Sequence, residues 1–275
     1  MVVTVEYILA SDKEHGVPEL DRDTAREWIE RWDRQQEVLL ADREDRFTAL
    51  IDAVQAAAGR PDPLVLDLGC GPGSLAVRLL ARLPQATVIG IDADPVTLTL
   101  GRGAYGDVPG LRFADVDLRA AGWGDRLGLQ RQPDAAVSTT ALHWLTESAL
   151  RSLYAELAGV LRPGGIFLDG DHLQLDEKEH PVLARLDRVL CEQEDKRRFP
   201  DGHAESWSGW WEAVAADPVL ASAAAERAER RVEADHHASA GGKLATHVDA
   251  LRDAGFAEIG TLWQRGVNRL LCAIR

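Results

Sequence analysis

The stretch LVLDLGCGPG, residues 64–73, decides the fold of this chain. Its first half is a short apolar run that is typical of a buried strand, and its second half contains three glycines. A helical pattern follows directly, from Ser74 to Leu83. Glycines between a strand and a helix let the backbone approach a ligand, and the start of the helix offers free N–H groups to it. The stretch alone therefore indicates a nucleotide-like ligand without saying which one.

Apolar runs and helical patterns alternate along the chain after this stretch. Such alternation, with nearly all-apolar strands, predicts a doubly wound α/β sheet that is covered on both faces. The order changes near the end, where the turn Arg265-Gly266 joins two apolar runs so closely that they must be antiparallel. We therefore expect a seven-stranded, mostly parallel, Rossmann-like sheet with a C-terminal antiparallel hairpin. The expected strands are 64–68, 86–92, 111–114, 135–139, 166–169, 256–264 and 267–274.

Two helical regions accompany this core. Apolar residues recur at three- and four-residue steps from Ile29 to Val54, which predicts one long helix that Asp23 or Thr24 could cap and that ends at Gly59. Another helical region separates the fifth and sixth strands. We expect an N-terminal helical lid at 1–60, a core at 61–171 and 243–275, and an inserted helical cap at 172–242. The cap helices are expected at 181–197, 205–216 and 218–231, and the last core helix at 243–254.

Composition excludes several classes of partner. Acidic residues outnumber basic ones by 45 to 31, and a formal charge of −14 argues against binding to nucleic acids or anionic membranes. The longest stretch without a charged residue, 135–146, is far shorter than the roughly 20 residues of a membrane-spanning helix. The start of the chain has no signal-peptide pattern, so a cytoplasmic location is expected. The sequence leaves open whether the chain is a monomer or a homodimer.

An acid ends the second expected strand about 20 residues after the last glycine, where a carboxylate can accept both hydroxyls of a ribose. This acid is Asp92. The dinucleotide fingerprint needs G-x-G-x-x-G or A, but Ser74 is the sixth residue counted from Gly69. The D-x-G-x-G-x-G spacing, Asp92, the ADVD at 114–117, the LRPGG at 161–165 and the terminal hairpin together resemble the class I S-adenosylmethionine-dependent methyltransferases. The resemblance covers about 64–171 and 244–275.

The resemblance implies S-adenosylmethionine as the cofactor and a role for each matching position. Asp67 would lie near the ammonium group, and Asp92 would bind the ribose hydroxyls. Asp115 would accept from the adenine amino group and the Val116 N–H would bind a ring nitrogen, although Asp115 or Asp117 could instead only cap a turn. In similar small-molecule enzymes a helix before the first strand folds over the cofactor, so Arg43 could pair with its carboxylate. The expected cofactor-binding residues are Asp67, Gly69, Cys70, Gly71, Gly73, Asp92, Ala93, Asp115, Val116, Thr139, Thr140 and Arg43.

His143 is the candidate catalytic residue. It follows the fourth expected strand, at the edge of the sheet where ligands bind in such folds. An imidazole titrates near neutrality and can accept a proton from a hydroxyl or an amine. Methyl transfer otherwise asks the protein only to align a nucleophile with the S–CH3 group and to exclude water. The alternative is that His143 packs the loop against the cap.

Aromatic residues in the cap are candidates for the acceptor site. The helical spacing of His203, Trp207, Trp210 and Trp211 is compatible with an aromatic wall for a flat or apolar acceptor, or with the cap's own core. The neighbours at 236–237 resemble a metal pair, but only His247 could accompany them, so no metal site is expected. The tentative substrate-binding residues are Trp144, His203, Trp207, Trp211 and His237.

These observations predict a methyltransferase that acts on an oxygen, nitrogen or carbon atom of a small molecule. A tetrad typical of DNA amino-methylation is absent, because STTA occupies residues 138–141. Two alternatives remain. One is a protein that binds S-adenosylmethionine without catalysis, since binding and transfer are separable. The other is a nicotinamide-dependent oxidoreductase, against which Ser74 and the terminal hairpin count.

Overall fold

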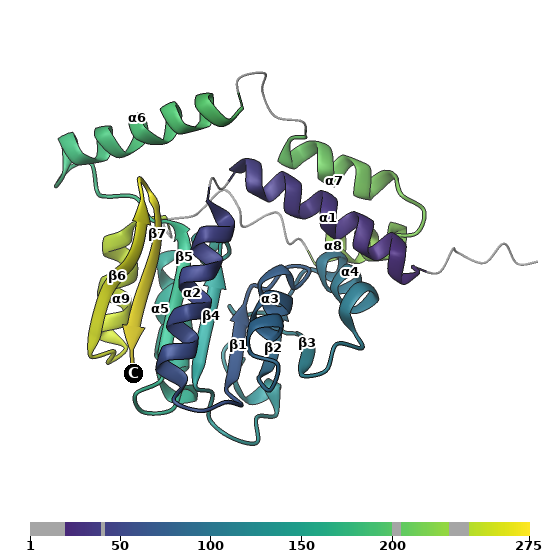
Figure 1. Ribbon diagram of the computed structural model, residues 1–275, viewed down its shortest axis with the longest axis horizontal. Coiled ribbons are helices and arrows are strands. Elements are labelled where there is room, and N and C mark those ends of the chain that lie inside the picture. The colour runs from purple at the N-terminus through teal and green to yellow at the C-terminus, as the bar shows by residue number, and fades with distance from the viewer. Residues whose placement is uncertain (1–19, 40–41, 200–204, 231–241) are drawn as a thin grey trace, which may run out of the picture.

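The computed structural model describes residues 20–39, 42–199, 205–230 and 242–275, which form a seven-stranded sheet with helices on both faces (Figure 1). The strand order is β3-β2-β1-β4-β5-β7-β6. Strand β7 is antiparallel to both of its neighbours, and the remaining pairs are parallel. The predicted fold is therefore confirmed. The strands are β1 (Leu64–Leu68), β2 (Thr87–Asp92), β3 (Leu111–Asp115), β4 (Ala135–Thr139), β5 (Ile166–His172), β6 (Glu258–Arg265) and β7 (Asn268–Ile274).

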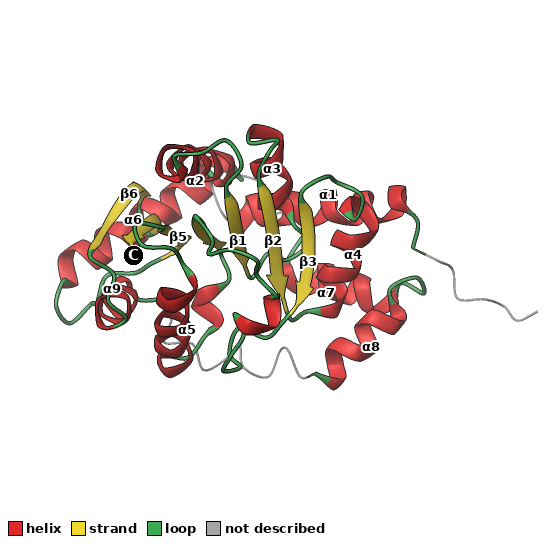
Figure 2. Cartoon of the chain, turned by 90° about the horizontal axis from the view of Figure 1, so that it is seen from below, coloured by secondary structure: helices red, strands yellow, loops and turns green. Residues whose placement is uncertain are grey.

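Helices cover the sheet in two layers (Figure 2). Helices α2 and α3 bury apolar side chains against one face, and α5 and α9 bury theirs against the other. A third apolar cluster joins α1, α4, α7 and α8. The helices are α1 (Arg22–Leu39), α2 (Arg43–Ala58), α3 (Ser74–Arg82), α4 (Pro95–Tyr105), α5 (Glu147–Val160), α6 (Pro181–Arg198), α7 (Trp207–Ala216), α8 (Ala221–Glu229) and α9 (Leu244–Asp253), with short 3-10 turns η1 (Asp125–Leu127) and η2 (Leu142–Trp144).

The strand order reverses between β1 and β4. The chain runs from β1 outward through β2 to β3 and then returns to the other side of β1 as β4. In doubly wound sheets such a reversal opens a crevice beyond the carboxyl ends of the two central strands. The glycine-rich loop follows β1 and the segment with His143 follows β4, so the two lie on either side of this crevice.

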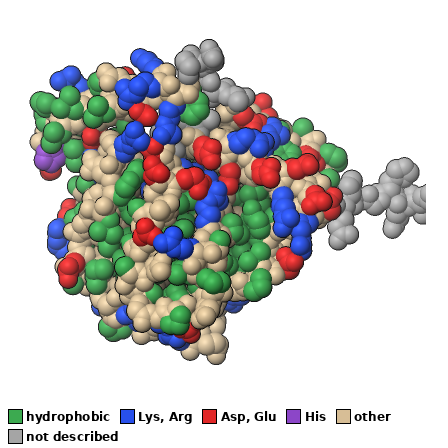
Figure 3. Space-filling view, viewed as in Figure 1, with side chains coloured by type: hydrophobic (Ala, Val, Ile, Leu, Met, Phe, Trp, Pro, Cys, Tyr) green, Lys and Arg blue, Asp and Glu red, His purple; other side chains and the backbone are tan. Residues whose placement is uncertain are grey.

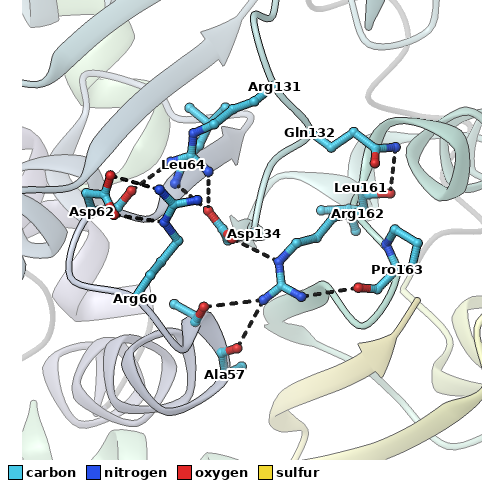
Figure 4. A network of polar contacts seen from close by, with 11 residues as sticks. Ala57, Arg60, Asp62, Leu64, Arg131, Gln132, Asp134, Leu161, Arg162 and Pro163 are labelled. Atoms are coloured by element: carbon cyan, nitrogen blue, oxygen red, sulfur yellow. Dashed lines mark hydrogen bonds and ion pairs between the residues drawn. The ribbon is translucent and has the colours of Figure 1, made fainter.

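An ion-pair network fixes the opposite, amino-terminal edge of the sheet (Figure 4). Asp134, buried just before β4, accepts from the Leu64 N–H of β1 at 2.9 Å. It also accepts from Arg131 at 2.6 Å and from Arg162 at 2.8 Å. Arg162 donates further to two carbonyl oxygens at the end of α2. These contacts tie β1, β4, β5 and α2 together far from the crevice.

The predicted long helix at the start of the chain is wrong in one respect, because the structure has two helices there. Asp42 adopts a left-handed backbone with φ of 70° and directly precedes α2, which a continuous helix would not allow. The cap of α1 is Asp21, which accepts from the Thr24 N–H at 2.9 Å, and not Asp23 or Thr24. Apolar periodicity continued across the break because both helices bury one face.

The two helices also differ in what they cover. Helix α2 buries Phe47, Leu50 and Val54 in the cluster on the sheet face, so it belongs to the core and not to a lid. Helix α1 packs against α4 and α7 instead. Of the region 1–60 that was expected to form a lid, only α1 lies over the crevice side of the described structure (Figure 1).

The region between β5 and α9 consists of two separate parts. Helices α7 and α8 pack on α1 and α4, whereas α6 lies above the tip of the β6–β7 hairpin (Figure 1). Ion pairs attach α6 through Asp187 to Arg269 at 2.7 Å and through Arg198 to Asp42. Apolar side chains of α6 remain exposed. Elsewhere on the face shown in Figure 3, acidic and basic side chains are mixed with one another. Of the described helices in this region, α7 and α8 therefore pack over the crevice side together with α1 and α4, and α6 does not.

Two strand boundaries differ from the prediction by more than one residue. Strand β5 continues to His172, three residues beyond the predicted end, so that Asp171 lies within the sheet. The charged residues near the end of the strand made this extension hard to recognise in the sequence. Strand β6 begins at Glu258, because Phe256 is instead buried beside α9 at the end of the loop. None of the described helices has the length and hydrophobicity needed to cross a membrane.

Candidate functional site

A cavity of about 450 Å³ occupies the crevice beyond β1 and β4. The glycine-rich loop, the segments after β2 to β5, and helices α1, α2, α7 and α8 contribute side chains to it. Most predicted cofactor-binding residues line it; Asp67, Gly73 and Asp115 do not. The lining residues include Trp32, Gln36, Arg43, Gly69, Cys70, Gly71, Asp92, Ala93, Val116, Asp117, Arg119, Thr139, Thr140, His143, Trp144, His172, Trp207, Trp211 and Arg227.

The glycine-rich loop is held in a conformation that glycine favours. Gly69, Gly71 and Gly73 all have positive φ. A Cβ on Gly69 would lie 2.4 Å from the Ala141 Cβ, so the loop packs directly against the segment after β4. A Cβ on Gly73 would lie 2.8 Å from the Phe113 ring, so Gly73 allows close packing against that ring, and it does not line the cavity.

Asp67 and Asp92 lie together at the ends of β1 and β2. Asp67 is fully buried, and neither of its carboxylate oxygens has a hydrogen-bond partner. Burial, and then the charge of Asp92, raise the pKa of Asp67 to about 8. Asp92 lines the cavity and accepts from the N–H groups of Gly71 at 2.7 Å and Ala93 at 2.8 Å. Burial and Asp94 raise the pKa of Asp92 to about 6, against these backbone donors.

The segment after β3 differs from its expected arrangement. Asp115 does not line the cavity; it pairs with Arg230, after α8, at 2.7 and 2.8 Å, and this contact lowers the pKa of Asp115. The Val116 N–H donates to the Asp92 carbonyl oxygen at 2.9 Å, so it is not available to a ring nitrogen, contrary to the expectation. The Val116 side chain and the Asp117 carboxylate, in contrast, line the cavity.

His143 and Asp171 form a close pair on the other side of the cavity. The His143 Nδ1 lies 2.8 Å from both carboxylate oxygens of Asp171, which is fully buried. Although burial alone would raise it, the pKa of Asp171 is lowered to about 2, chiefly by His143 and also by Arg46. With a proton on Nδ1 donated to Asp171, a neutral His143 keeps its lone pair on Nε2.

The backbone around this pair is constrained. Thr140 has φ of 50°, a left-handed conformation that is rare for a β-branched residue, and its N–H donates to the Gly170 carbonyl oxygen at 3.0 Å. Strained residues of this kind concentrate at functional sites. Thr139, Thr140 and His143 line the cavity together, and burial lowers the pKa of the neighbouring His172.

Arg43 lies at the mouth of the cavity on α2. It is buried, pairs with Asp33 of α1 at 3.0 Å, and its Nη1 has no hydrogen-bond partner. Asp33 also accepts from Ser74, the first residue of α3, at 2.6 Å. Helix α1 is thereby attached to the start of α3, directly after the glycine-rich loop, and Arg43 keeps one buried N–H group for a ligand.

The tryptophans of the cap divide into two sets. Trp210 is fully buried among α1, α4 and α8, as a core residue. Trp207 and Trp211 line the cavity instead, where Trp207 faces Trp144 with ring centroids 6.5 Å apart and planes inclined by 30°. The interpretation as the cap's own core therefore applies to Trp210, and the interpretation as an aromatic wall applies to Trp207 and Trp211. His203 and His237 lie outside the described residues.

His247 is part of the core. It is fully buried, with Nδ1 at 2.7 Å from the Tyr154 hydroxyl and 3.3 Å from Asp169. Within the described ranges, no cluster of three or more His, Cys, Asp or Glu side chains is arranged to hold a metal ion. Cys70 lines the cavity, but burial raises the pKa of its thiol well above the usual range, so it is not a reactive thiolate.

Sequence reasoning missed Asp171 and Arg46. Asp171 ends an otherwise apolar strand two residues after another acid, Asp169, which is a signal that could have found it. Arg46 is fully buried, and its guanidinium donates to Thr139 and Asn268. Its signal was a charged residue four positions before Leu50, on the buried face of a helix.

Comparisons with known proteins find similarity to methyltransferases. Residues 65–165 match the family described as a methyltransferase domain. Trans-aconitate 2-methyltransferase of Methylobacterium nodulans is 33% identical over 156 residues, which cover 56% of this chain and 55% of the relative. The relative of the same name from Azoarcus is 32% identical over 152 residues, 55% of each chain. The chain thus spans about half the length of the curated relatives it matches.

Solved structures share the fold. Human N-acetylserotonin methyltransferase in complex with its cofactor aligns with 92% of this chain and 57% of its own, with a TM-score of 0.52 at 15% identity. A possible exported protein from Bordetella parapertussis aligns with 84% of this chain and 67% of its own, with a TM-score of 0.56 at 16% identity. The match over residues 65–165 identifies an S-adenosylmethionine-dependent methyltransferase domain in that part of the chain, and the solved structures share its fold.

Proposed function

We propose that this chain transfers the methyl group of S-adenosylmethionine to a small-molecule acceptor, with His143 as the general base. The observation that carries the proposal is that the His143–Asp171 pair borders the same cavity as the glycine-rich loop and Asp92. A ligand on the loop and an acceptor beside His143 would therefore share one enclosed space.

The residues around the cavity fit the cofactor. Asp67, buried next to the glycine-rich loop and not itself lining the cavity, has carboxylate oxygens without a hydrogen-bond partner, which suits a nearby ammonium group. Arg43 has a buried Nη1 with no hydrogen-bond partner, 3.9 Å from Glu44 Oε1, and this group suits a carboxylate. Asp92 lies beside the loop at the position for a ribose, and Val116 offers an apolar surface for an adenine ring. When bound, S-adenosylmethionine supplies an electrophilic methyl group on its sulfonium.

The remaining chemistry belongs to the protein. His143 would accept at Nε2 the proton of an acceptor hydroxyl or amine as the oxygen or nitrogen bonds to the methyl carbon and the S–CH3 bond breaks. Asp171 would hold the ring in the tautomer that leaves Nε2 unprotonated. Trp144, Trp207 and Trp211 would shield the reacting atoms from water and support the acceptor.

The acceptor itself is a matter for direct testing. The curated relatives are named for trans-aconitate, so small carboxylic acids that also carry a hydroxyl or an amine are the first acceptors to try, because a carboxylate alone has no proton for His143 to accept. The tryptophan-lined part of the cavity supports flat aromatic hydroxyl or amine compounds as the second set.

The test is an acceptor screen with cofactor labelled in its methyl group. We expect label in a small-molecule product, with stoichiometric release of the demethylated cofactor, and loss of both in His143→Gln. Tight cofactor binding without turnover of any acceptor would instead support the non-catalytic alternative.

A further inference from the structure

Arg46 places a positive charge behind the His143–Asp171 pair. The side chain is fully buried, and its Nη2 donates to Thr139 Oγ1 of β4 while Nη1 donates to Asn268 Oδ1 of β7, both at 2.6 Å. These strands flank β5 on either side, so the guanidinium spans β5. Both hydrogen-bond partners are neutral, and Nε has none.

Gly170 makes this position possible. A Cβ at Gly170 would lie 2.9 Å from both the Cδ and the Nε of Arg46, so any larger residue would displace the guanidinium. Side chains alternate across a strand. Because Gly170 faces Arg46, Asp169 and Asp171 project from the opposite face of β5, and the backbone at Gly170 alone separates the cation from both acids.

The charges around the pair can be counted by element. Strand β5 provides Asp169, Asp171 and His172, and strand β7 provides Arg269, which lies opposite Asp171 and pairs with Asp187. Helix α2 provides Arg46 and, farther off, Arg43. Turn η2 provides His143, and Tyr154 of α5 and His247 of α9 contact one another behind Asp169. Burial, and then Asp171, raise the pKa of Asp169 well above its usual range, so Asp169 retains a proton more readily than Asp171. Asp171 is then the acid that needs a buried positive charge.

We propose that Arg46 is a positioning residue that balances the charge of Asp171, so that His143 can stay neutral with an open Nε2 rather than serve as the counter-ion itself. The inference rests on the proposed function of His143 as base. Burial lowers the pKa of Arg46 to about 10, which still leaves it charged at neutral pH.

Without Arg46 the balance changes. A lone buried carboxylate beside an imidazole stabilises the protonated ring, and a protonated ring cannot accept a proton from the acceptor. The loss of Arg46 should therefore favour the protonated form of His143 and weaken it as a base, while the glycine-rich loop stays intact.

The experiment uses the full chain in four forms: wild type, Arg46→Gln, Arg46→Lys and Arg162→Gln. Arg162 is the control, because it is another arginine beside a buried acid, Asp134, but lies at the opposite edge of the sheet (Figure 4). Histidine side chains labelled with ¹⁵N are titrated by NMR, with His143→Gln to assign the His143 signals. Calorimetry with S-adenosylmethionine provides the cofactor affinity.

We expect His143 to gain its proton at a pH at least about one unit higher in Arg46→Gln, a tenfold change in the protonation equilibrium. Arg46→Lys, which keeps the charge, should restore most of the wild-type behaviour, and Arg162→Gln should titrate like wild type. An unchanged or lower protonation pH in Arg46→Gln would overturn the proposal, and so would a Lys variant that behaves like the Gln variant.

A second variant keeps the test decisive if Arg46→Gln does not fold. Gly170→Ala retains the arginine but crowds its Cδ and Nε, so it should shift His143 in the same direction by a smaller amount. A titration like that of wild type would again contradict the proposal.

The NMR readout does not depend on turnover. Failure of the proposed function would appear separately, as full activity in His143→Gln. Where an acceptor is available, the acid limb of the pH–rate profile should move with the His143 titration in Arg46→Gln.

Discussion

The two halves of the cavity differ in the partners that they provide for a buried acid. At the ends of β1 and β2, Asp67 has no hydrogen-bond partner, and its nearest charged influence is another acid, Asp92. At the end of β5, Asp171 accepts from His143 and lies across the strand from Arg46. One half leaves Asp67 without a positive partner in the protein and suits a cationic ligand, whereas the other is balanced within the protein and suits the movement of a proton.

The largest expected effect falls on the balanced half. His143→Gln should reduce turnover of the acceptor by about 10²–10⁴-fold, because it removes the proposed general base. The dissociation constant of S-adenosylmethionine should stay within about twofold, since the cofactor half does not depend on His143. Steady-state kinetics and calorimetry on the same preparation measure both. An equal loss in turnover and affinity would mean that His143 supports the structure of the whole cavity.

The next effect falls on the uncompensated half. Asp92→Ala should weaken S-adenosylmethionine binding at least about tenfold, because it removes an acceptor for the ribose and the anchor of the Gly71 N–H. Asp92→Asn is the milder control, since it keeps one acceptor oxygen. If calorimetry finds the same dissociation constant in the Ala variant as in wild type, Asp92 is not part of the site.

Two tryptophans on one helix sharpen the distinction between wall and core. Trp210→Ala should lower the free energy of unfolding by about 3–5 kcal/mol, because the side chain is fully buried. Trp207→Ala should cost less stability and raise the KM for the acceptor several-fold, because this ring lines the cavity. Denaturant unfolding and kinetics on both variants test these two expectations. The opposite pattern of effects would mean that Trp210, and not Trp207, forms the wall of the acceptor site.

The smallest expected effect is the release of a proton when the cofactor binds. Because the pKa of Asp67 is raised to about 8, this acid is mostly protonated at pH 7 in the ligand-free protein. An ammonium group nearby favours the ionised form, so cofactor binding at pH 7 should release about 0.9 proton from Asp67. Calorimetry in buffers of different ionisation enthalpy measures this release. Asp67→Asn should abolish it, and a release that persists in that variant would exclude Asp67 as its source.

The two halves also differ in how far the sequence predicts them. The loop at 69–73 and Asp92 follow from spacing, because adjacent parallel strands bring the ends of consecutive β–α units together. Asp171 and Arg46 reach His143 and Thr139 from other elements, and no local pattern links such distant positions. Resemblance therefore located the cofactor half, and only the three-dimensional structure assembled the other.

Local chemistry also set the limits of the fold prediction. Periodicity identified the strands and most helices, but it could not place the break at Asp42, where the backbone leaves the helix while the apolar face continues. The same limitation hid the different roles of Trp207 and Trp210, which share one helix and differ only in the neighbours that tertiary packing provides.

The most direct test of the account is one calorimetric series with S-adenosylmethionine, its demethylated product and NADH, on wild type, Asp92→Ala and His143→Gln. The account predicts micromolar binding of the first two ligands and none of NADH, with affinity lost in Asp92→Ala and retained in His143→Gln. Binding of NADH alone, or affinity that depends on His143 and not on Asp92, would contradict it.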